Sequence, residues 1–582
     1  MRASSLVVVL IVAKALTLAG RELPVSVWAL PVFVWHDVAV GAAFYAIDRG
    51  LGRPRALWAA YALVAGLAAV NVPVTLALSS PLTVPMLRAA GGPIADSFAH
   101  YVTASNLARI AAVCLVAALA PAALERLPRR LRGAGLVAGL ALLGVGPFAA
   151  AEVSTRGLHR NAVTSLAASV FPRVAGVAGE DEWRVSPYAM PDGAGSEDLT
   201  MLRGRAAGQS VLLVALESTA ARYLASYGAA EDPTPNLTRL ARGGLVFENA
   251  YVVYPESIKG LFATLCSRDP AFDVAAEVHA ASPCAPLARI LAQAGYRTAL
   301  FHSGRFDYLG MRAVVGQQGF ERAEDAGDIG GNLESSFGVD EPATVARMLE
   351  WIDTLDPGEP FFVTYLPIAG HHPYAAFAPG PFEGTAEIDA YRNALYDGDR
   401  ALGALLAGLR ARGLDDDTVV VAFGDHGEAF GEREGNVGHT FFLFDENIRV
   451  PLVISGLPLA ASTDAPAPAR VERVASVTDI APTILDLLGL PAEPAHEGVS
   501  LLEPAPRMAL FFTDYALGWL GLRDGCWKYL FEIDSRRSML FDVCADPDEA
   551  RDRSAEYAAR VETYRARLEA WASARRAEID KR

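Results

Sequence analysis

The chain has 582 residues, of which 52% are hydrophobic and 20% charged, and its net charge is −16. Its mean hydropathy of +0.24 is high for a soluble enzyme. Residues 1–155 contain 12 Lys and Arg against 6 Asp and Glu, so the acidic charge lies in the rest of the chain. A basic, apolar front joined to an acidic back excludes a nucleic-acid binder with a basic face, a disordered chain and a small disulfide-rich protein.

Five apolar segments in the first 151 residues are each close to the roughly 20 residues that cross a bilayer as a helix. They are residues 4–20, 24–47, 56–78, 107–124 and 134–151. Arg is concentrated in the loops 48–55 and 125–133, and loops rich in Lys and Arg stay in the cytoplasm. Five crossings from a cytoplasmic N-terminus predict a multi-pass cell-membrane protein with everything after residue 151 outside the cytoplasm. A cleavable signal peptide is the alternative for the first segment.

Two charged residues fall inside these predicted spans, Lys14 in the first and Asp37 in the second. A charge at such a depth is costly unless it is paired, so we expect the two side chains to meet. A structural ion pair is the simpler interpretation, and a lipid-headgroup site is the alternative.

Four of the five cysteines lie in the predicted extracytoplasmic part, in two pairs close in sequence. In an oxidising compartment this spacing predicts the disulfides Cys266–Cys284 and Cys526–Cys544. A zinc site built from the four thiolates is the alternative, although no CxxC spacing supports it.

From residue 210 onward, apolar β-rich runs alternate with helical stretches. SVLLVALES, TALFHSG, FFVTYLPIAGHH and TVVVAFGDHGE each read as a buried strand that ends in polar residues. Strands that are apolar throughout and separated by helices predict an α/β fold, with a mostly parallel sheet flanked by helices. Sites in such sheets lie at the carboxyl ends of the strands. The predicted domains are a transmembrane domain at 1–151, a linker at 152–207, a catalytic domain at 208–500 and a C-terminal subdomain at 501–582.

Metal-ligand residues recur at these strand ends. Glu217 follows one predicted strand, and Asp425 and His426 follow another. Two carboxylates and an imidazole suit a divalent cation such as Zn²⁺ or Mn²⁺ and leave a position open for substrate. Ser257 precedes an apolar helix-like run, where it is either a helix cap or a nucleophile for a phosphoryl group. Lys259 is a candidate for neutralising phosphate oxygens.

The chain resembles the sulfatase-like branch of the alkaline phosphatase superfamily, in particular the membrane-bound lipoteichoic acid synthases and phosphoethanolamine transferases. The resemblance rests on segments that occur in the family's order over about residues 208–550. They are VLLVALEST (211–219), TPNLTRLARGGLVFENAY (234–251), the Ser257 segment, GYRTALFHSG (295–304), HHPY (371–374), FGDHGEAFGE (423–432), NIRVPLVISG (447–456), DIAPTILDLLGLP (479–491) and the tail GLRDGCWKYLFE with LFDVCADPDEARD. The tail is similar to the family's small C-terminal subdomain.

The resemblance implies roles for individual residues. Glu217, Asp425 and His426 become metal ligands, and Ser257 becomes the metal-bound nucleophile, although the transferase branch commonly uses threonine there. His371 and His439 would contact the transferred phosphate and move protons. His372, Arg312 and His302 are further candidates for substrate binding.

The Ser257 context favours phosphoryl over sulfate chemistry. Formylglycine formation in sulfatases needs a C/S-x-P-x-R context, and Ser257-Ile-Lys-Gly-Leu has neither the Pro nor the Arg. The expected function is a membrane-anchored, metal-dependent transferase that moves a phospholipid-derived group, with a membrane lipid as donor and a cell-envelope lipid or glycan as acceptor. A phosphodiester or sulfuric ester hydrolase and a catalytically inactive membrane scaffold are the alternatives.

Overall fold

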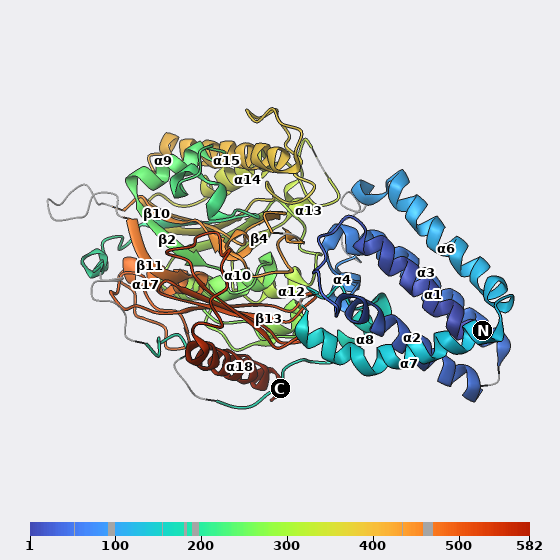
Figure 1. The fold of residues 1–582 in the computed structure, drawn as a ribbon. Helices are drawn as coiled ribbons and strands as arrows, with labels where there is room; N and C mark the ends of the chain where they lie inside the picture. Colours follow the sequence, from blue (N-terminus) through green and yellow to red (C-terminus); the bar gives the residue numbers. More distant parts are fainter. Residues whose placement is uncertain are drawn as a thin grey trace.

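A helical N-terminal part stands beside a larger α/β domain in this computed structural model (Figure 1). The structure describes residues 1–51, 53–90, 99–153, 155–179, 183–188, 197–333, 335–433, 435–457 and 470–581. Parts of the predicted linker, at 180–182 and 189–196, lie outside the described residues.

Long helices form at all five predicted apolar segments. The N-terminal helices are α1 (Arg2–Leu18), α2 (Ala29–Leu51), α3 (Pro54–Leu78), α4 (Val84–Ala89), α6 (Ala104–Glu125), α7 (Arg129–Glu152) and α8 (Ala162–Ala168). Within the described residues, four stretches are long and apolar enough to cross a membrane, namely Ala29–Gly50, Pro54–Leu78, Ala104–Glu125 and Gly133–Ala150. The structure therefore has four such stretches where the sequence predicts five spans. The difference is α1, whose 17 residues rise about 25 Å, less than the ~30 Å of a hydrocarbon core.

Helix α1 packs inside the helical part and holds the predicted ion pair. Its Leu6, Val9 and Leu10 are fully buried. The Lys14 Nζ lies 3.8 Å from the Asp37 Oδ2, which confirms the expected contact. The same ammonium donates hydrogen bonds to three carbonyl oxygens of the segment that follows α7, those of residues 158, 159 and 160. The pair thus ties the connector to the helices, as expected of a structural ion pair.

The core of the α/β domain is a nine-stranded, mostly parallel sheet, as predicted. The strands are β1 (Ser210–Leu216), β2 (Leu245–Tyr251), β3 (Arg297–His302), β4 (Arg322–Glu324), β5 (Phe361–Leu366), β6 (Thr418–Gly424), β9 (Arg449–Val450), β10 (Leu452–Ser455) and β11 (Arg470–Ser476). Their order is β11-β2-β10-β6-β1-β5-β3-β4, with β9 paired to β2. Strand β10 runs antiparallel to both neighbours, whereas β6, β1, β5, β3 and β4 are mutually parallel.

Helices cover both faces of this sheet because its strands are apolar on both sides. On β1, Leu212 and Val214 belong to one hydrophobic core and Val211 and Leu213 to the other. Helices α9 (Pro235–Gly243), α14 (Glu341–Ile352) and α15 (Glu387–Ala411) cover the first face. Helices α10 (Ser257–Cys266), α11 (Leu287–Gln293), α12 (Met311–Gly316) and α17 (Ile480–Leu487) cover the second. The short helices α13 (Ala326–Ile329) and α16 (Asp445–Ile448) lie in connecting segments.

The C-terminal region adds a second, antiparallel sheet. Its strands are β12 (Ala509–Thr513), β13 (Trp519–Asp524), β14 (Trp527–Glu532) and β15 (Arg537–Asp542), followed by helix α18 (Ala558–Asp580), and a separate hairpin pairs β7 (Ala429–Phe430) with β8 (Val437–Gly438). Both predicted disulfides, Cys266–Cys284 and Cys526–Cys544, are formed. The domain boundaries themselves stay a prediction.

Candidate metal and nucleophile site

The candidate site lies at the carboxyl edge of the large sheet. Strands β1 and β6 pair in parallel with Leu216 opposite Gly424, so the next residues, Glu217 and Asp425, leave the sheet side by side. His426 follows directly, and all three side chains are buried. Sequence reasoning could find these residues because neighbouring parallel strands end at one edge.

Ser257 is the first residue of α10, and it does not cap the helix. The cap is Glu256, whose carboxylate accepts hydrogen bonds from the amides of Ile258 and Lys259 at 3.0 and 3.2 Å. The Ser257 hydroxyl instead donates to the Glu217 Oε2 at 3.3 Å. The helix-cap alternative is therefore wrong, and the hydroxyl faces the carboxylate. The capping role of Glu256 was not foreseen, although Glu directly before the predicted helix was a visible signal.

We call Glu217, Ser257, Asp425 and His426 the ligand cluster. The ligand atoms of Glu217, Asp425 and His426 all lie within 4.8 Å of one another. The His426 Nε2 is 3.5 Å from the Ser257 Oγ and from the Glu217 Oε1, and 3.7 Å from the Asp425 Oδ2. The His426 Nδ1 lies 2.9 Å from the Gly427 carbonyl oxygen. This contact places the ring hydrogen on Nδ1, so the Nε2 lone pair is available to a metal.

Ser218 holds the two carboxylates in place, and sequence reasoning missed it. Its amide donates to the Asp425 Oδ1 and its hydroxyl to the Glu217 Oε1, both at 3.0 Å. The residue has a φ of 52°, a left-handed conformation that is strained for a non-glycine residue and is found more often at functional sites. The sequence carries no signal for such a conformation at a serine.

The ligand cluster has an excess of negative charge. Burial, and then the neighbouring Asp425, raise the pKa of Glu217 well above its usual value. Among the ion pairs of the described residues, Glu217 and Asp425 are paired with His426 and with no Lys or Arg. Two buried carboxylates without a cationic partner are costly. Their oxygen atoms and the imidazole nitrogen therefore fit a divalent cation such as Zn²⁺ or Mn²⁺.

Two predicted proton-transfer residues lie beside this cluster. The ring of His439 stacks on that of His426 with centroids 4.0 Å apart, and its Nδ1 is 2.9 Å from the Glu428 Oε2. The ring of His371 stacks on Phe337. Burial lowers the pKa of His439 to about 4. Burial and then His439 lower the pKa of His371 to about 3, so both rings are neutral near pH 7.

His302 and His372, both predicted to bind substrate, lie in different surroundings. His302 ends β3, contacts the Leu366 carbonyl oxygen through its Nδ1, and lines a small cavity together with Glu217 and Ser257. His372 instead stacks on Tyr101, from the segment before α6. Of the two adjacent histidines, His371 therefore neighbours the ligand cluster, and His372 faces the helical part.

The structure does not bring Lys259 or Arg312 to the ligand cluster. Residues two apart in a helix differ in direction by about 200°, so Lys259 and Ser257 lie on nearly opposite sides of α10. Its ammonium is 2.9 Å from the Asp514 Oδ2. The side chain of Arg312 is 60% exposed and pairs with Asp307 and Asp325. The substrate role given to each stays a prediction.

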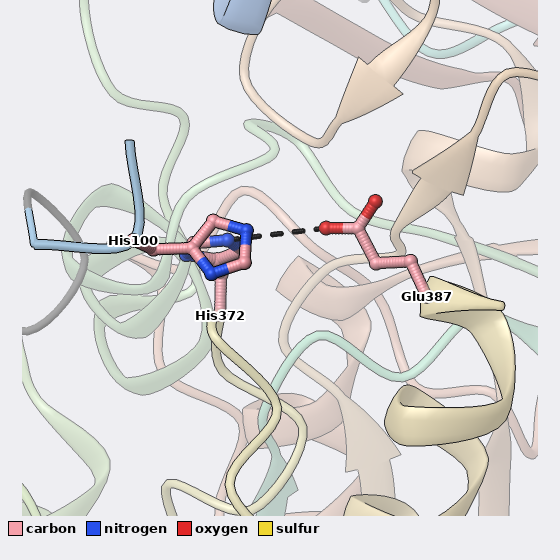
Figure 2. A group of neighbouring side chains, drawn as sticks. All are labelled: His100, His372 and Glu387. Carbon is pink, nitrogen blue, oxygen red and sulfur yellow. Dashed lines mark ion pairs between the residues drawn. The ribbon is translucent and has the colours of Figure 1, made fainter. Parts of the chain in front are cut away.

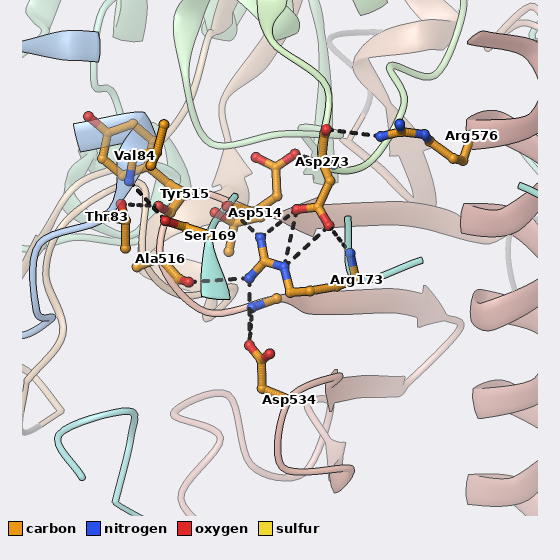
Figure 3. Close-up of polar contacts among 12 residues, drawn as sticks. Thr83, Val84, Ser169, Arg173, Asp273, Asp514, Tyr515, Ala516, Asp534 and Arg576 are labelled. Atoms are coloured by element: carbon orange, nitrogen blue, oxygen red, sulfur yellow. Dashed lines mark hydrogen bonds and ion pairs between the residues drawn. The ribbon is translucent and has the colours of Figure 1, made fainter. Parts of the chain in front are cut away.

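Lys259 belongs to a second polar group, which we call the paired cluster: Lys259, Asp514, Arg173 and Asp273. The Arg173 guanidinium lies 2.6 Å from the Asp273 carboxylate, and Figure 3 shows Arg173 enclosed by acidic and carbonyl oxygens. The group lines a cavity of about 750 Å³ whose wall also includes Val84, Pro85 and Arg88 of α4. Next to it, the Thr83 hydroxyl donates to the Tyr515 carbonyl oxygen at 2.9 Å. The helical part and the α/β domain thus meet at this cavity.

The family model named Sulfatase matches residues 209–490. This part of the chain is therefore similar to sulfatases. Glu217, Asp425 and His426 lie within the matched residues.

Curated relatives match the chain in part. Arylsulfatase K from Bos taurus is 29% identical over 178 residues, which cover 27% of this chain and 32% of that protein. Lipoteichoic acid synthase 2 from Bacillus subtilis (strain 168) is 23% identical over 307 residues, covering 49% of this chain and 46% of that protein. The chain thus matches less than half the length of either relative.

Among solved structures, a protein of the alkaline phosphatase superfamily from Vibrio parahaemolyticus has a TM-score of 0.52 and 20% identity. The match covers 68% of this chain and 93% of that one. This likeness shows that the two proteins share a fold.

Proposed function

We propose that the protein is a membrane-anchored, metal-dependent transferase that moves a phospholipid-derived phosphoryl headgroup to an extracytoplasmic acceptor through a covalent bond to Ser257. The observation that carries the proposal is the Ser257 hydroxyl, 3.3 Å from Glu217 and 3.5 Å from His426. This serine stands in a sequence without the Pro and Arg that formylglycine formation requires. An unmodified hydroxyl is a nucleophile for phosphorus.

The ligand cluster would hold the metal. A divalent cation bound by Glu217, Asp425 and His426 would lower the pKa of the Ser257 hydroxyl and polarise a phosphoryl oxygen. The cluster has the donor atoms and the negative charge that such an ion requires.

The chain's own residues supply the other steps. The Ser257 hydroxyl gives its proton to a neutral imidazole as its Oγ attacks phosphorus in line, the bond from phosphorus to the diglyceride oxygen breaks, and that oxygen takes the proton as it leaves. A phosphodiester on Ser257 remains. An acceptor alcohol then gives its proton to a neutral imidazole and attacks the same phosphorus, and the Ser257 oxygen leaves and takes that proton back. His439 is the stronger candidate for that base because Glu428 orients its Nδ1 and leaves its Nε2 able to accept a proton.

The junction with the helical part supports a membrane lipid as donor. The 750 Å³ cavity is lined both by α4 and by Glu256 and Lys259, which flank Ser257 in the chain. A lipid held near the helices would bring its headgroup toward the start of α10. The acceptor in this proposal is a cell-envelope lipid or glycan.

The proposed location is the cell membrane, with a cytoplasmic N-terminus and the α/β domain outside. The Arg-rich loops support this orientation. Two disulfides in the α/β domain and its C-terminal sheet support an oxidising compartment.

A hydrolase of phosphate or sulfate esters is the second candidate. It is favoured by the match to arylsulfatase K, whose name describes sulfate ester chemistry. Water in place of the acceptor alcohol would convert the proposed transferase into a phosphodiesterase at the same site.

The mass of the Ser257 peptide, from protein purified from its own membranes and quenched in acid, tests the proposal. A phosphoryl-type adduct that is present in wild type and in Glu383→Gln, which changes an exposed carboxylate, but absent in Glu217→Ala would support it. Loss of two hydrogens from Ser257 would mean formylglycine and would favour the sulfatase. An unmodified serine throughout a time course with a phospholipid donor would reject the covalent step.

A further inference from the structure

A second group of metal-ligand side chains joins the helical part to the α/β domain. It consists of His100, four residues before α6, His372, in the loop after β5, and Glu387, the first residue of α15 (Figure 2). One ligand atom from each residue lies within 4.8 Å of the other two. We propose that His100, His372 and Glu387 bind a zinc ion that links the helical part to the α/β domain.

The donor set is that of a zinc site. Two imidazoles and one carboxylate are common zinc ligands, and a water molecule or substrate fills the fourth position. Ligand atoms around a tetrahedral zinc lie about 3.3 Å apart, given bonds of ~2.0–2.1 Å. The His372 Nε2 is already 3.9 Å from the Glu387 Oε1. Each side chain needs to move by only about an ångström, which a small change of rotamer supplies.

The three residues differ in burial in a way that allows this closure. His372 is half-buried, and its ring lies between those of Tyr101, with which it is stacked at 5.6 Å, and Tyr374, which meets it edge-on at 5.4 Å. His100 and Glu387 are exposed. A fixed histidine with two adjustable partners can adopt zinc geometry without rearranging the backbone.

The position of this site gives it a structural consequence. His100 lies in the helical part, whereas His372 directly follows His371, which neighbours the ligand cluster. An ion bound here would fix the loop that carries His371 relative to the helices. The site shares no residue with the ligand cluster, so it does not depend on the proposed function.

Metal content measured on the full-length protein in detergent tests the proposal. The protein is incubated with excess zinc, passed through a desalting column and analysed for zinc per chain. We expect about two zinc ions in wild type and about one in His100→Ala or Glu387→Gln. Glu217→Gln should lose the ion at the ligand cluster and keep the ion at His100. The double variant Glu217→Gln/His100→Ala should lose both ions. Glu383→Gln, an exposed carboxylate four residues from Glu387, is the matched control and should keep two.

Cobalt gives a second, positive readout. His100→Cys keeps a ligand and adds a sulfur, so the Co²⁺-loaded variant should gain a thiolate-to-cobalt absorption band that wild type lacks, and adding Glu387→Gln should weaken it. The proposal is overturned if His100→Ala retains the zinc content of wild type, or if wild type holds only the ion that Glu217→Gln removes. In those cases His372 and Glu387 lie side by side without a metal. If the wild-type protein binds zinc at this site but transfers no phosphoryl group, the proposed function fails and the zinc site stands.

Discussion

Two buried polar groups include residues at the start of helix α10, and they differ in charge balance. In the paired cluster, each carboxylate meets a cation: Asp514 meets Lys259 at 2.9 Å and Asp273 meets Arg173 at 2.6 Å. In the ligand cluster, Glu217 and Asp425 share only an imidazole.

The same contrast appears in the pKa values of Asp514 and Glu217. Burial alone would raise the pKa of Asp514, but Lys259 beside it brings the pKa below its usual value. For Glu217, burial and Asp425 act together and raise the pKa. A balanced buried group can be complete with protein atoms alone, whereas an unbalanced one needs a cation from solution. The difference supports a structural role for the first group and the proposed metal binding for the second.

The largest effect is expected from Ser257→Ala, which removes the nucleophile and leaves both clusters' charges unchanged. Cleavage of a chromogenic aryl phosphodiester by the full-length protein should fall on the order of 10⁴-fold or more, with no change in melting temperature. Ser257→Thr, which keeps a hydroxyl, is the control and should retain measurable activity. Full activity in Ser257→Ala would remove this serine from the mechanism.

Lys259→Met tests the structural reading of the paired cluster. It leaves the Asp514 carboxylate buried without its cation and should destabilise the protein by about 3–5 kcal/mol. We expect a clear fall in the melting temperature, measured by tryptophan fluorescence. The double variant Lys259→Met/Asp514→Leu removes both charges and should recover most of the loss. If Lys259→Met melts like wild type and yet loses activity, Lys259 binds substrate, as the sequence first predicted.

The residues that sequence analysis placed well are those that follow directly from strand ends. Glu217 and Asp425 come after strands in parallel register, so a correct sheet brings them together. The disulfide partners are only 18 residues apart, which also made them predictable.

The features that sequence analysis does not reach concern direction and distance. The direction of Lys259 depends on where α10 begins and on the helical turn between it and Ser257, which the motif alone does not show. The approach of His100 to His372 joins residues far apart in the chain through the packing of the helical part against the α/β domain. The predicted first span, residues 4–20, has the same length as α1 and is offset from it by two residues at each end.

His439→Gln tests whether the residues beside the ligand cluster act in catalysis. It removes the proposed base beside the ligand cluster without touching a metal ligand, so metal content should stay at the wild-type level. Activity should fall about 10²–10⁴-fold, the usual contribution of general acid–base catalysis. Added imidazole should restore part of the rate. Unchanged turnover would transfer the role to His371, and His371→Gln then becomes the variant to measure.

The smallest effect is a change in stability. It is expected when one carboxylate in each cluster is replaced by an amide, in protein that a chelator has freed of metal. Glu217→Gln removes one of two buried carboxylates that repel each other, so it should raise the stability of the metal-free protein by about 0.5–2 kcal/mol. Asp514→Asn leaves Lys259 buried without its counter-charge and should lower it. Melting curves of the two variants should therefore shift in opposite directions. Added zinc should stabilise wild type and Asp514→Asn more than Glu217→Gln, because Glu217→Gln lacks the intact ligand cluster and keeps only the proposed zinc site at His100, His372 and Glu387. Shifts of the same sign for both variants would mean that Glu217 has a cationic partner within the protein, and the argument for a metal from charge imbalance would then fail.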